Sequence, residues 1–296
     1  MAAPCVVAHG GAGSDARHRD GPAKACLLGL AALQGGENAL EATVRAAVHL
    51  EDDPRFNAGT GSVIRLDGKT IEMDASCMTS DGKFGAVTLL RDVKNPILVA
   101  RKVMETPHRI LGGEGALRFA RAHGFKSHDP THAEARREWE RRRAQVADKP
   151  STDSPWDLAA LRRHWNFATS MKDALGCDTI GAVARAADGT FAAANSTGGT
   201  SFTIQGRIGD SPVPGCGLYA GPAGAVATTG RGEEILREFL ALRVYERIEQ
   251  GMEPAQACQW GVERIDKKFA IGVIAVGRTS SGGACNRPMA WAKAPR

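Results

Sequence analysis

The chain has 296 residues, 43% of them hydrophobic and 24% charged, which is enough apolar material for one large domain or two modest ones. Its formal net charge is only +5, and the arginines between residues 136 and 163 alternate with glutamates and lack interleaved aromatic residues, which argues against a nucleic-acid partner. No segment approaches the roughly 18 apolar residues of a membrane helix, the seven cysteines form no C-x-x-C pair, and we expect a reducing, cytoplasmic setting without a membrane partner.

The first part of the chain alternates between strand and helix patterns. Apolar residues recur at helical spacing in some segments, and the hairpin signals Asp67-Gly68 and Asp81-Gly82 interrupt others. The expected elements are, in order, a strand at 5–8 that stops at His9, helices at 23–33 and 37–50, strands within 62–90, and helices at 96–105 and 115–123.

The sequence turns polar and charged between residues 126 and 178. Asp129-Pro130 and Lys149-Pro150 interrupt it, so we expect a partly mobile linker that contains some charged helix. The elements expected after it are a β-hairpin of 179–184 and 191–195 around Asp188-Gly189, helices at 233–250 and 254–269, and a strand at 270–276.

The dipeptide Asp178-Thr179 lies at the junction between the linker and the hairpin. If the backbone is cut before Thr179, this residue carries both a hydroxyl nucleophile and a free α-amine. Such an amine has an ordinary pKa of about 7.7 to 8.0, so it can act as the base that a threonine hydroxyl needs. An Asp-Thr pair that opens a strand is most often plain structure, so the neighbouring motifs must decide between the two interpretations.

Two other chemistries receive little support. The run His9-Gly10-Gly11 is similar to the oxyanion loop of some serine esterases, but no G-x-S-x-G motif accompanies it. His128 and His132 have the spacing of metal ligands on a helix, but Pro130 lies between them and there is no H-E-x-x-H motif. The chain also has no Walker-type or dinucleotide-binding glycine motif.

Polar residues downstream of Thr179 could hold a small zwitterionic substrate. Arg207 can bind a carboxylate through two charge-assisted hydrogen bonds, and Asp210 can bind an α-ammonium group. Thr229 and Gly230 precede a helix expected from residue 233, so a hydroxyl and a backbone N–H could face a developing oxyanion. Each feature alone also fits a strand end, a loop ion pair or a helix N-terminus.

Seven ordered motifs resemble those of the plant-type L-asparaginase and isoaspartyl peptidase family of N-terminal-nucleophile (Ntn) hydrolases, which includes the glycosylasparaginases. They are HGGAG at 9–13, FNAGTGS at 56–62, EMDA at 72–75, DTIG at 178–181, STGG at 196–199, GRIGDSP at 206–212 and TGRGE at 229–233. The resemblance runs from His9 to about Trp291 and is weakest across 126–176.

The resemblance implies an α+β fold, namely a single Ntn-hydrolase domain over 1–296 built as a four-layer αββα sandwich. It implies a precursor that is cut between Asp178 and Thr179 into an α-chain, 1–178, and a β-chain, 179–296. The linker 126–178 would then end at the cleavage site. The cleaved pairs are expected to form a homodimer.

The resemblance also implies the catalytic roles. Thr179 would attack the side-chain amide of asparagine or a β-aspartyl peptide, with its own α-amine as base and a β-aspartyl enzyme as intermediate. Thr197 would hydrogen-bond near the Thr179 hydroxyl. Thr229 and the N–H of Gly230 would form the oxyanion hole.

Other residues would bind and support the substrate site. Arg207 and Asp210, together with Gly230 and Gly232, would hold the aspartyl carboxylate and amine, while Asn57 and Gly10 support the site. No catalytic cofactor is implied. A structural sodium ion is implied by a loop whose backbone carbonyls resemble a sodium site, those of Leu50, Glu51, Asp53, Phe56, Ala58 and Thr60.

The subfamily stays open. Asp178 and Cys285-Asn286 match the glycosylasparaginase pattern, whereas the start at His9 and the run Thr228-Thr229-Gly230 resemble the asparaginase branch. We expect an asparaginase with β-aspartyl dipeptidase activity on small molecules. A glycosylasparaginase and an amino-acid-binding relative that never matures are the alternatives.

Overall fold

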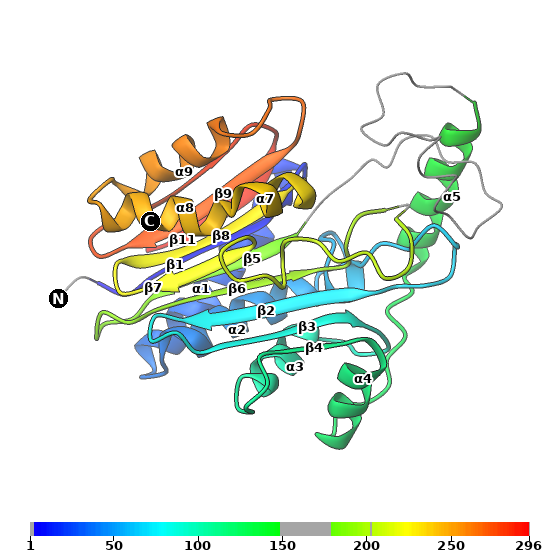
Figure 1. Cartoon of the computed structure of the whole chain (residues 1–296), viewed down its shortest axis with the longest axis horizontal. Coiled ribbons are helices and arrows are strands. Elements are labelled where there is room, and N and C mark those ends of the chain that lie inside the picture. Colours follow the sequence, from blue (N-terminus) through cyan, green and yellow to red (C-terminus); the bar gives the residue numbers. More distant parts are fainter. Residues whose placement is uncertain (1–2, 149–178, 202, 296) are drawn as a thin grey trace.

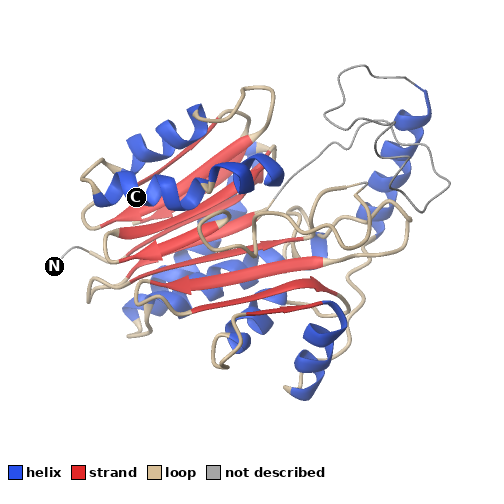
Figure 2. Cartoon of the chain, in the orientation of Figure 1, coloured by secondary structure: helices blue, strands red, loops and turns tan. Residues whose placement is uncertain are grey.

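Two β-sheets packed face to face between layers of helices form the body of the protein (Figures 1 and 2). The computed structural model describes residues 3–148, 179–201 and 203–295. The expected α+β sandwich of four layers, helix on sheet on sheet on helix, is confirmed. Asp178 and the part of the predicted linker from residue 149 lie outside the described residues.

The larger sheet has the strand order β11-β1-β5-β6-β2-β3-β4. Its strands are β1 (Cys5–Ala12), β2 (Met73–Thr79), β3 (Phe84–Leu90), β4 (Ile110–Gly112), β5 (Ile180–Arg185), β6 (Phe191–Thr197) and β11 (Met289–Ala294). Neighbouring strands are antiparallel except β3 and β4. Strands from the two sides of residue 178 are therefore interleaved in one sheet, since β1 lies between β11 and β5 while β6 pairs with β2.

The smaller sheet has the order β10-β9-β8-β7 and packs on the larger one. Its strands are β7 (Leu218–Gly221), β8 (Gly224–Gly230), β9 (Ile271–Gly277) and β10 (Ser281–Cys285). Side chains alternate between the two faces of each strand, so Val7 and Val183 point into the core between the sheets, where they meet Ile274 and Val276. Val6, one residue earlier, packs under the helices instead.

Helices cover the outer face of each sheet. On the larger sheet lie α1 (Asp20–Gln34), α2 (Ala39–Glu51), α3 (Pro96–Val103) and α4 (Gly113–Ala122); on the smaller one lie α8 (Leu240–Glu249) and α9 (Pro254–Glu263), preceded by α7 (Gly232–Glu238). Short 3-10 turns occur at Ala16–Arg19 and Gly59–Gly61. No helix in the described ranges is both long and apolar enough to cross a membrane.

The start of α2 shows why the helices begin where they do. The side chain of Asn38 accepts a hydrogen bond from the backbone N–H of Glu41 at 2.9 Å, which satisfies a donor that the helix itself leaves unpaired. Leu40, Val44 and Ala47 then fall on one face and are buried against the sheet.

Several boundaries differ from the sequence predictions. The first strand does not stop at His9 but continues to Ala12, because β5 and β11 pair with it from both sides. The single helix expected at 233–250 is two helices, since Phe239 adopts a left-handed conformation with φ +48° between α7 and α8. Residues 62–72 form no strand and turn at 66–69, and Thr229 lies inside β8, a strand that was not predicted.

The segment predicted as a linker contains α5 (Ala133–Asp148), which stands apart from the sandwich in Figure 1. Ala135 and Trp139 of this helix pack on a small cluster of Ile64, Ile71 and Met73. The helical part of the prediction is therefore present, and it is docked on the turns that precede β2.

Candidate active site

Thr179 lies directly before β5, in the middle of the larger sheet, and is 5% exposed. β5 and β6 pair with Ile180 opposite Ser196, and the same antiparallel register places Thr179 opposite Thr197. On the other side of β6, Thr197 pairs with Asp74 of β2. The fold thus brings two of the predicted catalytic threonines to the same end of neighbouring strands.

Thr229 and Gly230 reach this end of the sandwich from the smaller sheet. The Thr229 hydroxyl accepts a hydrogen bond from the backbone N–H of Ala12 at 3.2 Å, so the ends of β8 and β1 meet. Gly230 has φ +130°, and a Cβ there would lie 2.0 Å from the carbonyl oxygen of Ala270. Only glycine fits this backbone, because a side chain would collide with β9.

Arg207 and Asp210 converge over Gly232. A Cβ on Gly232 would lie 2.8 Å from Arg207 Nη2 and 2.9 Å from Asp210 Oδ1, so the glycine leaves both side chains access to the same space. Burial raises the pKa of Asp210 to about 7, although Arg207 acts in the opposite direction. A cation and a carboxyl group therefore stand side by side, as a zwitterionic α-amino acid requires.

Glu233, at the start of α7, is the partner of Arg207 in this structure. Its Oε1 accepts from Arg207 Nη2 at 3.0 Å and from Nε at 3.1 Å, and its Oε2 lies 3.2 Å from Arg231 Nε. Burial alone would raise the pKa of Glu233, but the two arginines hold it below its ordinary value. Glu233 thus occupies one edge of the guanidinium that the sequence assigns to a substrate carboxylate.

Asn57 holds the turn that follows Thr197. The side-chain Nδ2 of Asn57 donates to the Gly199 carbonyl at 2.6 Å, and the backbone carbonyl of Asn57 accepts from the N–H of Gly198 at 3.0 Å. The hydroxyl of Thr197 accepts from the N–H of Gly199 at 3.0 Å. Gly10 supports the same region by leaving room for an aromatic ring, since a Cβ there would lie 2.2 Å from Phe56.

Sequence reasoning assigned no role to His9, Asn195 and Thr228. The ring of His9 and the amide of Asn195 meet over Gly181, where a Cβ would lie 2.5 Å from His9 Nε2 and 2.4 Å from Asn195 Oδ1. Burial lowers the pKa of His9 to about 3, while the Thr179 backbone acts in the opposite direction, so a neutral imidazole lies next to the candidate nucleophile. The only signal for His9 was its place in the HGGAG motif.

Thr228 supports Asp210 from the neighbouring strand. Its hydroxyl lies 3.0 Å from the Cys216 carbonyl oxygen and 3.4 Å from Asp210 Oδ2. The N–H of Gly217 donates to the Asp210 carbonyl at 3.1 Å. The position of Asp210 is therefore set by both its side chain and its backbone.

The loop predicted to hold sodium is tightly folded, with its backbone segments close to one another. Gly59 has φ +52°, and a Cβ on it would lie 2.5 Å from the Glu51 carbonyl oxygen, while a Cβ on Gly61 would lie 2.0 Å from that of Phe56. In the described part of the chain, no cluster of His, Cys, Asp and Glu side chains is arranged for a metal ion. Three of the carbonyls predicted as ligands, those of Asp53, Phe56 and Ala58, accept backbone hydrogen bonds from Phe56, Ala58 and Gly61 within the loop.

Comparison with known proteins finds a matching family model and relatives that are similar over most of the chain. A family model described as asparaginase matches residues 2–293. A plant-type L-asparaginase of Pyrococcus furiosus is 38% identical, over 92% of this chain and 89% of the relative. Proteins named isoaspartyl peptidase/L-asparaginase are 37% identical in Danio rerio and 39% identical in Homo sapiens, over 98% of this chain and 91% and 93% of the relatives.

Proposed function

The chain belongs to the asparaginase family, and from this premise we propose that it hydrolyses the side-chain amide of L-asparagine and β-aspartyl dipeptides with Thr179 as an N-terminal nucleophile. The observation that carries the proposal is the convergence of Arg207 and Asp210 over Gly232. This arrangement suits the free α-carboxylate and α-ammonium groups that both substrates share. The names of the relatives support the same substrates.

Maturation would create the nucleophile. The Thr179 hydroxyl attacks the carbonyl of Asp178, the peptide C–N bond breaks, and the nitrogen takes the hydroxyl proton as an ester forms. Water then hydrolyses the ester, which leaves a carboxylate on Asp178 and a free α-amine on Thr179. The buried position of Thr179 at the head of β5 supports a fixed geometry for this attack.

The hydrolytic cycle would use the same hydroxyl. The α-amine of Thr179 takes the hydroxyl proton as the oxygen attacks the substrate amide, and Thr229 and the N–H of Gly230 stabilise the oxyanion. The C–N bond then breaks, and ammonia or an amino acid leaves with that proton. Water, deprotonated by the same amine, hydrolyses the β-aspartyl ester and releases aspartate.

Four further assignments belong to this proposal. The cycle needs no cofactor, and a sodium ion bound by the carbonyls of the 50–60 loop would stiffen the segment that carries Asn57. The cleaved pairs would assemble as a homodimer. The described cysteines are free and five of the six are buried, which supports a reducing, cytoplasmic compartment.

The test combines intact mass under denaturing conditions, N-terminal sequencing and release of ammonia from asparagine. We expect the wild-type protein to give two fragments, one of which begins at Thr179, and to hydrolyse asparagine. Thr179→Ala should remain one inactive chain of 31.3 kDa. The control Thr190→Ala, at the exposed turn between β5 and β6, should be cut and active. A Thr179→Ala protein still cut before residue 179 would contradict the proposal.

Asp178 favours glycosylasparaginase as a second candidate. Rates on asparagine, a β-aspartyl dipeptide and an asparagine-linked N-acetylglucosamine separate the two candidates. A kcat/KM highest on the sugar conjugate would select glycosylasparaginase. A wild-type protein that stays uncut and only binds amino acids would select the alternative that never matures.

A further inference from the structure

The segment that carries Arg207 and Asp210 connects β6 to β7 without forming a helix or strand in its described residues. Its position depends on contacts with the turns before β2. The N–H of Leu66 donates to the Thr203 carbonyl at 3.0 Å, and the side chain of Gln205 donates to Thr70 Oγ1 at 2.6 Å. A substrate site on an irregular segment needs such anchors, because the segment lacks the regular backbone hydrogen bonds that hold a strand to its neighbour.

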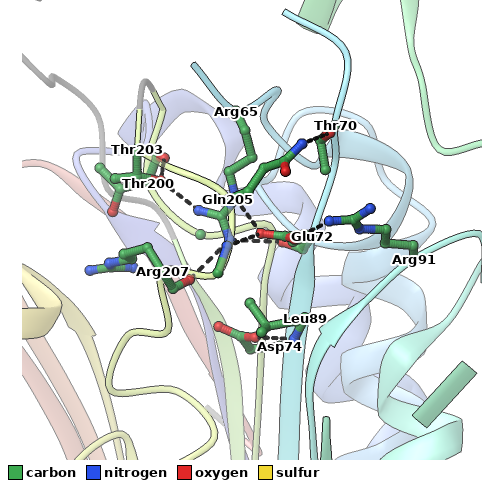
Figure 3. A network of polar contacts seen from close by, with 12 residues as sticks. Arg65, Thr70, Glu72, Asp74, Leu89, Arg91, Thr200, Thr203, Gln205 and Arg207 are labelled. Carbon is green, nitrogen blue, oxygen red and sulfur yellow. Dashed lines mark hydrogen bonds and ion pairs between the residues drawn. The ribbon is translucent and has the colours of Figure 1, made fainter. Parts of the chain in front are cut away.

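Arg65 is the central anchor, and Figure 3 shows its guanidinium between Thr203, Glu72 and the backbone of Arg207. The side chain is 0% exposed. Nη1 donates to Thr203 Oγ1 at 2.6 Å, and Nη2 donates to the Arg207 carbonyl at 3.2 Å and to the Glu72 carbonyl at 3.3 Å. Gly199 provides the space, because a Cβ there would lie 2.5 Å from Nη1.

Acidic side chains around Arg65 balance its positive charge at a site that is closed to solvent. Glu72 Oε2 lies 3.5 Å from Arg65 Nε and accepts from the N–H of Gly206 at 2.8 Å, and Glu72 Oε1 pairs with Arg91. Asp74, also buried, interacts with both Arg65 and Arg207. Burying an arginine costs free energy unless its donors are paired. The hydrogen bonds of Arg65 therefore favour the arrangement of the Arg207 segment that supplies their acceptors.

Arg65 is itself held by α5. Trp139 Nε1 donates to the Arg65 carbonyl at 3.0 Å, and Arg136 donates to the Gly68 carbonyl at 3.0 Å. The Trp139 ring also lies against Gly68, where a Cβ would be 2.9 Å away. A continuous set of contacts therefore leads from α5 through Arg65 to Arg207.

We infer that Arg65 is a positioning residue that sets Arg207 for the substrate α-carboxylate, and that α5 holds Arg65 in place through Trp139. The inference rests on the proposed function. It assigns α5 a part in substrate binding, whereas the sequence predicted a linker that contains some charged helix. It also assigns Arg65 no part in bond breaking, because its guanidinium donates to Thr203, Glu72 and Arg207 among the described residues and not to the catalytic threonines.

The decisive variant is Arg65→Lys, which keeps the charge. A lysine ammonium is a single point that cannot replace a planar guanidinium donating in several directions at once. Arg185→Lys is the matched control, because Arg185 is also buried and donates to the carbonyls of Gly277 and Ala3, at the far end of β5 from Thr179.

The readout compares asparagine with its α-amide, which lacks the carboxylate charge. In Arg65→Lys we expect the KM for asparagine to rise about tenfold, with kcat within about threefold, as expected when a charge-assisted binding contact is lost. The preference for asparagine over the amide should fall by the same factor. Arg185→Lys should keep that preference, whatever its effect on stability.

Two milder variants cover the case in which Arg65→Lys does not fold. Thr203→Val removes the acceptor of Nη1 and should lower the preference for asparagine several-fold, because a charged hydrogen bond is lost. Trp139→Phe removes the indole donor and should act in the same direction. Its control, Trp260→Phe on α9, changes a ring that contacts Arg247 and Arg264 on the other side of the sandwich, and it should have no effect on the preference.

The outcomes separate the inference from its premise. A wild-type protein that hydrolyses neither substrate contradicts the proposed function itself. An active wild type whose Arg65→Lys and Thr203→Val variants keep the full preference for asparagine overturns the role of Arg65. Equal loss of turnover on both substrates also overturns it, because it would show a general structural effect.

Discussion

Asp210 is the residue of the candidate site whose charge depends most directly on pH near neutrality. Burial raises its pKa to about 7, far above that of an exposed aspartate. It is therefore ionised above pH 7 and neutral below, and only the ionised form can pair with a substrate ammonium group. Lowering the pH from about 8 to 6 should raise the KM for asparagine about tenfold, as the ionised fraction falls by that factor.

The control for this pH effect is succinamate, which has the carboxylate and the amide of asparagine but no amino group. Its KM should not rise toward low pH, because it makes no ion pair with Asp210. Protonation of the Thr179 α-amine would lower kcat on both substrates and is thereby distinguished. A KM for asparagine that stays level between pH 8 and 6 would show that Asp210 is already ionised at pH 6.

At this scale, the sequence predicts residues whose function lies in their own side chains. Arg207 and Asp210 stand three positions apart in a recognisable motif, and the structure places them together over Gly232. Arg65 and Asn195 could not be predicted, since they act through backbone carbonyls of distant segments. The Asn195 amide donates to the Gly217 carbonyl at 2.6 Å, a contact that leaves no trace in the identity of residue 217.

Among the elements, α2 offers a clear test of local stabilisation. Asn38→Ala removes the hydrogen bond to the Glu41 N–H and should lower the free energy of unfolding by about 1 kcal/mol. Activity should not change, because the cap lies at the end of α2 remote from Asn57. Urea unfolding with a linear extrapolation measures the difference.

The comparison is Asn95→Ala, at the corresponding position of α3. Asn95 makes no side-chain cap bond to its helix; its amide donates to Asp52 at 3.0 Å and also interacts with the carboxyl group of Glu51. Its replacement should cost less than that of Asn38. Equal losses in the two variants would mean that the cap bond of α2 contributes nothing specific.

Elements with a strong local pattern could be predicted, and elements defined by distant partners could not. The helices near 23–33, 37–50 and 96–105 and the hairpin around Asp188-Gly189 are confirmed, each within a few residues. The predicted end of β1 was wrong because the run His9-Gly10-Gly11 looks like a loop in the sequence, whereas pairing with β5 and β11 makes it part of the strand. The break at Phe239 was missed because nothing in its sequence marks a left-handed residue.

For the molecule as a whole, the order of strands decides what happens after a cut before Thr179. β1 of the first fragment would lie between β5 and β11 of the second, and β6 of the second would pair with β2 of the first. We expect the two fragments to stay together and to unfold in one transition. A preparation tagged at its C-terminus should retain both fragments in native buffer and only the smaller one in denaturant.

The Thr179→Ala protein provides the matching control, since its uncut chain should unfold near the same denaturant concentration. If the larger fragment can be washed away under native conditions, the sheet has come apart at β1 and the interleaved arrangement does not describe the mature protein. The four-layer class could be predicted from the family resemblance. The interleaving of strands from the two fragments could be known only from the strand pairing in the structure.

The position of β1 also determines when, during synthesis, the larger sheet can be completed. β1 is synthesised well before its partners β5 and β11, and β11 follows the other strands that the structure describes. Contacts so distant in sequence form late and slowly. The end of β1 that meets Thr229 is therefore incomplete until β11 has been made, and a nascent chain lacking β11 would hold an inert threonine at position 179.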